Sequence, residues 1–77
     1  MKFRPGQRVI LKPKPDTIYY FPGFIGQTGK ITKVVVDDSI PYRVLFDISP
    51  KDWGSDTNTQ VCMEHDLIFA TSFNKYL

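Results

Sequence analysis

The sequence predicts an all-β domain, and three observations lead to this fold class. Six prolines and five glycines interrupt the chain every few residues, which leaves no segment for a helix of several turns. The short runs between them are rich in Val, Ile, Thr, Tyr and Phe, the residues enriched in strands. A length of 77 residues suits one small core, so we expect a single domain over residues 1–77.

Five runs have the composition of strands and are bounded by turn residues. They span residues 7–12, 29–36, 42–47, 59–63 and 68–70, and residues 64–67 are expected to form a 3₁₀ turn. The clearest two-residue period runs from Tyr42 to Phe46, where apolar and polar positions alternate. In the second run, Ile31 and Val34 lie three residues apart. A bulge or strong coiling is needed there to turn both side chains inward.

These elements predict a small five-stranded SH3-like barrel with a long first loop and a 3₁₀ turn before the last strand. The first loop covers residues 13–28. Gly26 and Gly29, around its end, suggest a turn or bulge that needs a positive φ angle. Closing a small sheet on itself hides the unpaired edges of its outer strands. The side chains expected to be largely buried are Val9, Leu11, Ile31, Val34, Val44, Phe46, Val61 and Leu67.

Aromatic residues are concentrated in the first loop. Four of them lie within six residues, and Trp53 stands in a polar loop later in the chain. They either cap an open end of the barrel or form a contact surface, since aromatic side chains supply large area at low entropic cost. We take the second alternative as the leading function, a protein-interaction surface. Its predicted partner-binding residues are Tyr19, Tyr20, Phe21, Phe24 and Trp53.

The charge is unevenly distributed along the chain. Residues 1–36 carry a net charge of +6 and residues 37–77 a net charge of −4. Most charges on a small domain are simply solvated, but a basic face beside Tyr19 or Tyr20 would suit single-stranded nucleic acid. Nucleic-acid binding is therefore the alternative function. The residues predicted to contribute to it are Arg8, Lys12, Lys30, Lys33 and Arg43.

The sequence offers little for catalysis or metal binding. Cys62 is the single cysteine and His65 the single histidine, so no intrachain disulfide forms and a zinc site lacks ligands. A Cys–His nucleophile pair needs a third group that orients the base, and adjacent residues rarely converge in this way. We therefore expect Cys62 in the core, His65 in the 3₁₀ turn, and no enzymatic activity, metal site or cofactor.

The N-terminal residues 1–6 lack the apolar segment of a signal peptide. No apolar run approaches the ~20 residues that a transmembrane helix needs. The expected location is cytoplasmic, without a membrane partner.

Two groups of residues resemble known families over most of residues 5–70. The motifs Pro5-Gly6-x-x-Val9 and Gly26-x-x-Gly29-Lys30-Ile31 resemble the opening of KOW-type SH3-like domains. The motifs Tyr42-x-Val44-x-Phe46 and Glu64-His65-Asp66-Leu67 resemble small SH3-like proteins encoded by phages and prophages. Because these are structural glycines and core residues, the resemblance implies the fold more than the activity. It also leads us to expect a phage or prophage accessory protein.

Overall fold

The computed structural model describes residues 2–70, and their secondary structure is built from short strands and 3₁₀ turns. The strands are β1 (Arg8–Leu11), β2 (Thr28–Val34), β3 (Tyr42–Phe46), β4 (Thr59–Cys62) and β5 (Leu67–Phe69). The 3₁₀ turns are η1 (Pro22–Phe24) and η2 (Glu64–Asp66). This part of the chain contains no α-helix, so the expected all-β class is confirmed. The five strands and η2 lie where the sequence predicts them, whereas η1 was not predicted.

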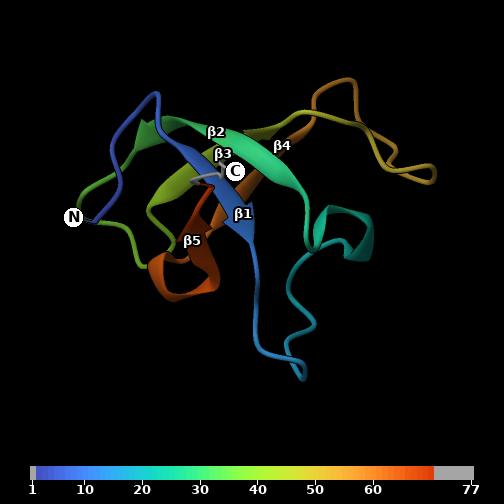
Figure 1. Ribbon diagram of the computed structural model, residues 1–77, viewed down its shortest axis with the longest axis horizontal. Helices are drawn as coiled ribbons and strands as arrows, with labels where there is room; N and C mark the ends of the chain where they lie inside the picture. Colours follow the sequence, from blue (N-terminus) through green and yellow to red (C-terminus); the bar gives the residue numbers. More distant parts are fainter. Residues whose placement is uncertain (1, 71–77) are drawn as a thin grey trace, which may run out of the picture.

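The five strands form one antiparallel sheet in the order β4-β3-β2-β1-β5 (Figure 1). β4 and β5 are consecutive in the chain but occupy opposite edges of the sheet, and η2 connects them. The first loop (residues 12–27, between β1 and β2) and the β3–β4 loop (residues 47–58) both extend away from the sheet (Figure 1). Within residues 2–70, no helix is long and apolar enough to cross a membrane.

The irregularity expected in the second strand is present in β2. Ile31 lies opposite Val44 and Lys33 lies opposite Arg43, so the register shifts between Ile31 and Lys33. The extra residue lets Ile31 face the core while Val34 packs against the same core. As a consequence, Lys33 stands on the outer side of the sheet.

The core lies on the inner side of the sheet and largely matches the expectation. Six of the eight predicted core residues are buried, and the exceptions are Val34 and Val61, which are half-buried. The register explains Val61: it lies opposite the outward-facing Arg43, whereas Cys62 lies opposite the inward-facing Tyr42. Because neighbouring strand residues point to opposite sides, Cys62 takes the inner position in β4. The core also contains Phe3, Tyr20 and Phe24, which the sequence did not assign to it.

Candidate functional site

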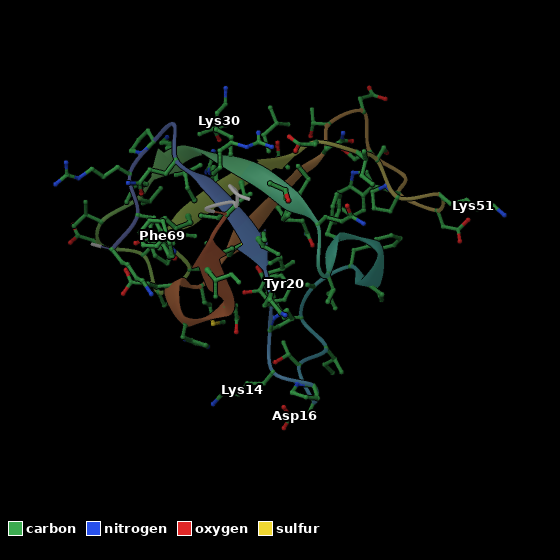
Figure 2. All side chains as sticks on the ribbon, in the orientation of Figure 1. Lys14, Asp16, Tyr20, Lys30, Lys51 and Phe69 are labelled. Carbon is green, nitrogen blue, oxygen red and sulfur yellow. The ribbon has the colours of Figure 1, made fainter. Side chains whose placement is uncertain are left out.

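An open groove of about 400 Å³ lies between the first loop and the β3–β4 loop. The first loop contributes η1 and the residue before it, and the β3–β4 loop contributes a short polar segment. The residues that line the groove are Phe21, Pro22, Gly23, Pro50, Lys51 and Asp52. In Figure 1 the two loops reach the same side of the molecule. Figure 2 shows Lys51 at the outer end of the β3–β4 loop. The floor is mainly apolar, with charges of both signs at the rim.

The two loops touch at Gly23. A β-carbon placed on this glycine would lie 2.3 Å from Cβ and 2.8 Å from Cγ of Pro50. No side chain fits into this space unless the loops separate, since real β-carbons do not approach other heavy atoms so closely. Glycine is therefore required here by contact between two loops that are distant in sequence.

Trp53 holds the β3–β4 loop against the core. Its ring centroid lies 5.1 Å from that of Phe21 and 4.9 Å from that of Phe24, both in edge-to-face geometry. Its Nε1–H donates to the carbonyl of Thr57 at 2.6 Å. Trp53 is half-buried, so part of its surface contacts solvent beside the groove.

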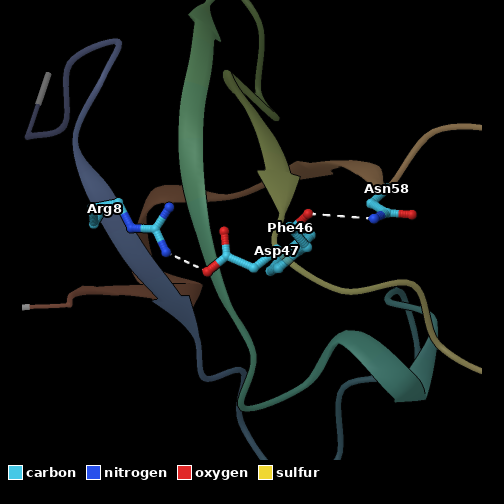
Figure 3. Close-up of polar contacts among 4 residues, drawn as sticks. All are labelled: Arg8, Phe46, Asp47 and Asn58. Carbon is cyan, nitrogen blue, oxygen red and sulfur yellow. Dashed lines mark hydrogen bonds and ion pairs between the residues drawn. The ribbon is translucent and has the colours of Figure 1, made fainter.

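The base of the β3–β4 loop is closed by hydrogen bonds between Phe46 and Asn58. The Phe46 N–H donates to the Asn58 carbonyl at 2.8 Å, and Asn58 Nδ2 donates to the Phe46 carbonyl at 3.5 Å (Figure 3). The loop is thus bonded across its base and packed on the core through Trp53. This arrangement gives the groove a defined shape.

The predicted partner-binding aromatics divide into two groups. Tyr20 is 4% exposed and Phe24 is fully buried, so in this conformation neither side chain is available to a partner. The Phe24 ring stacks on Phe46 at 4.7 Å, which explains its burial. Tyr19 is 46% exposed, and Phe21 is half-buried at the groove wall. The expected surface is therefore reduced to Tyr19, Phe21 and Trp53, because the other two aromatics complete the core.

Tyr20 is held by a buried hydrogen-bond network at η2. Its hydroxyl donates to Oδ2 of Asp66 at 2.5 Å and accepts from the N–H of Met63 at 3.0 Å. Burial, together with the bond to Asp66, raises the pKa of Tyr20 above its usual value. Asp66 is itself 3% exposed, so the bond from Tyr20 supplies a buried carboxyl group with a hydrogen-bond donor.

Tyr42 makes a parallel contact at the other end of η2. Its hydroxyl donates to Oε1 of Glu64 at 2.6 Å and accepts from the N–H of Phe3 at 3.2 Å. The N–H of Lys2 donates to the same Glu64 oxygen at 2.9 Å. Burial and the bond to Glu64 raise the pKa of Tyr42, and the bond from Tyr42 lowers the pKa of Glu64. Two tyrosines therefore attach η2 to the rest of the fold.

Cys62 and His65 occupy different environments. Cys62 is fully buried, and burial with the nearby charge of Asp66 raises the pKa of its thiol to about 12. The His65 side chain is 66% exposed, with Nε2 at 3.5 Å from Oδ1 of Asp66. Within residues 2–70, no group of three or more His, Cys, Asp or Glu residues is arranged to hold a metal ion.

Four of the five predicted basic residues share the outer side of the sheet. Arg8 lies directly opposite Lys30, and Lys33 lies directly opposite Arg43. All four are exposed. The Arg8 guanidinium forms an ion pair with Asp47 (Figure 3). The fifth, Lys12, lies just beyond the end of β1. Because the Tyr20 side chain is in the core, it does not join these residues.

No protein-family model, curated protein or solved structure matches this chain.

Proposed function

We propose that the chain is a non-enzymatic protein-interaction module built on an SH3-like barrel. The strand order β4-β3-β2-β1-β5, the long first loop and the 3₁₀ turn between β4 and β5 support this fold assignment. The connection between the two edge strands is only four residues long (63–66), a length that suits a partly closed barrel. Following the resemblance of its motifs, we propose that the module is a phage or prophage accessory protein that works in the cytoplasm.

The observation that carries the proposal is the apolar groove between the two loops. Pro22 and Pro50 give it rigid walls, so little conformational entropy is lost when a ligand binds. Phe21 and Trp53 offer partly exposed aromatic surface at the same place. Exposed aromatic side chains in a preformed depression are typical anchoring points in protein interfaces. Lys51 and Asp52 at the rim suit a ligand with polar groups on both sides of an apolar anchor.

The ligand that fits this geometry is an extended segment of another protein with one apolar anchor residue. The test selects binders from a display library of random linear peptides and measures their affinity by calorimetry. Pro22→Asp places a charge in the groove at an exposed position, and we expect it to weaken the selected peptides about tenfold or more.

Lys14→Gln is the matched control, since Lys14 is exposed in the first loop away from the groove residues. We expect this variant to bind the peptides as the wild type does. Peptides that bind Pro22→Asp with wild-type affinity would show that the contact surface is not the groove.

A further inference from the structure

Every charged residue within the five strands is basic. The four are Arg8, Lys30, Lys33 and Arg43, and the acidic residues of the described chain all lie in loops and turns. The alternation along the strands places these four side chains on the outer side of the sheet, where all are exposed. The outer side of the sheet therefore carries these four positive charges, and no strand contributes an acidic residue to it.

The register arranges these charges as two like-charge pairs. Arg8 is directly opposite Lys30, and Lys33 is directly opposite Arg43. Like charges in directly opposed positions destabilise a sheet, so the arrangement opposes folding. Asp47 balances one of the four through its ion pair with Arg8 (Figure 3). Within residues 2–70, the other three, Lys30, Lys33 and Arg43, form no salt bridge.

We infer that this outer face binds the phosphate backbone of duplex nucleic acid. Lys30 and Lys33 are three residues apart along β2, but the bulge between them leaves their partners on β3, Leu45 and Arg43, only two residues apart. The two basic pairs are therefore separated by ~7 Å at ~3.3 Å per residue. Duplex DNA carries one phosphate charge for every ~1.7 Å of its axis, so several phosphates lie within that span. Thr28 of β2 and Thr59 of β4 lie opposite Ile10 and Leu45, on the same side of the sheet as the basic residues. They add hydroxyl groups of the kind that contact phosphates.

We infer a duplex and not a single strand because the strands place no aromatic side chain on the outer face. Strand aromatics Tyr42 and Phe46 are buried, and Phe69 lies opposite the inward-facing Val9. Single-stranded nucleic acid is usually bound by stacking bases on aromatic side chains, and the strands present none on this side. An acidic protein segment would have to match the two basic pairs in position, whereas the dense phosphates of a duplex satisfy them in any register.

The experiment measures fluorescence anisotropy of a labelled 20-base-pair DNA duplex of mixed sequence at several salt concentrations. Lys30→Gln with Lys33→Gln should weaken binding about tenfold and reduce the slope of log affinity against log salt by about 2. Asp47→Asn should bind more tightly than the wild type, because it removes the acid that balances Arg8. The double variant should keep or raise the thermal midpoint, since it relieves like-charge repulsion.

Lys14→Gln is the control, because Lys14 is exposed at the opposite end of the molecule from Lys30 (Figure 2). The inference is overturned if Lys14→Gln weakens binding as much as the double variant, or if the wild type does not bind the duplex at low salt. It is also overturned if a single strand of the same length, or polyglutamate as an acidic-protein probe, binds more tightly than the duplex.

Discussion

Gly23 shows at the scale of one residue how the two loops constrain each other. In sequence it follows a proline and reads as an ordinary turn glycine. In the fold, the space that its side chain would occupy is filled by Pro50. The residue is determined by a contact across the groove and not by its own backbone angles.

We expect Gly23→Ala to lower the free energy of unfolding by about 1–3 kcal/mol, because the added methyl group forces the loops apart. Urea titration followed by Trp53 fluorescence measures the change. Gly54→Ala is the matched control, since a β-carbon there meets nothing within 4 Å. Equal stability of the two variants would contradict close packing of the loops.

Cys62 shows that a thiol in the sequence need not be reactive in the fold. The thiol is fully buried and its pKa is raised to about 12, so thiolate is scarce at neutral pH. We expect a thiol reagent such as a disulfide dye to modify the native protein at pH 8 only slowly, and quickly in denaturant. Rapid modification of the native protein would show that β4 opens readily or that the side chain is accessible.

At the scale of elements, η2 is held by side chains from two distant segments. Tyr20 of the first loop contacts Asp66, and Tyr42 of β3 contacts Glu64. Each tyrosine hydroxyl also accepts a hydrogen bond from a backbone N–H, so each hydroxyl bonds both a carboxylate and a backbone amide. These bonds link the first loop and β3 to the connection between the two edge strands.

Tyr20→Phe removes a hydroxyl from this network and leaves Asp66 and the N–H of Met63 without that partner. Because Asp66 is buried, we expect the free energy of unfolding to fall by about 1–3 kcal/mol. Urea titration monitors the loss, and Tyr19→Phe at an exposed ring is the control. Wild-type stability of Tyr20→Phe would mean that water replaces the hydroxyl in these bonds. Because Tyr20 is part of the core, we expect its truncation to Ala to destabilise the fold further.

At the scale of the whole molecule, one aromatic chain of contacts connects the sheet to the groove. Phe46 of β3 stacks on Phe24 of η1, which in turn contacts Trp53 of the β3–β4 loop. The groove therefore depends on the same packing that stabilises the sheet. A change in the core is expected to affect both stability and ligand binding.

Phe46→Ala should cost about 3–5 kcal/mol, because it removes a buried ring from the centre of this packing. A domain of this size has little stability to spare, so a large unfolded fraction is expected by circular dichroism without denaturant. Leu45→Ala, at an exposed position of the same strand, is the control. Native stability of Phe46→Ala would contradict the inward orientation of that residue.

Stability should fall at both extremes of pH, for separate reasons. The raised pKa values of Tyr20, Tyr42 and Cys62 mean that the folded state favours their protonated forms, so their contribution is present at neutral pH and lost as pH rises above about 9–10. The lowered pKa of Glu64 acts in the opposite sense, and its contribution is lost as pH falls below about 4.5. Thermal midpoints measured from pH 3 to 11 should therefore form a plateau near neutrality.

Tyr20→Phe should reduce the loss on the alkaline side, because one of the titrating groups is gone. Stability that still rises above pH 10 would contradict the assignment of these pKa shifts.

The positions of the strands followed from the sequence by itself. Turn residues bound each strand, and the two-residue period from Tyr42 to Phe46 identifies the inner side of β3. The spacing of Ile31 and Val34 was enough to predict the bulge in β2. Such features are local, since they depend on backbone preferences and on side chains a few residues apart. Gly26 has the expected positive φ angle, +83°, but Gly29 does not. Gly29 is instead required by close packing, because a β-carbon there would lie 2.7 Å from Cγ1 of Val44 on the neighbouring strand.

Only the tertiary structure decided which aromatics belong to the core and which charges lie side by side. Tyr19 and Tyr20 are adjacent in sequence, yet one is exposed and the other is bonded to Asp66, 46 residues away. Arg8 and Lys30 become neighbours only through the pairing of β1 with β2. Composition cannot separate these cases, because the burial of a loop side chain and the neighbours of a charge depend on contacts between distant segments. Those contacts form only when the sheet and the two loops are packed together.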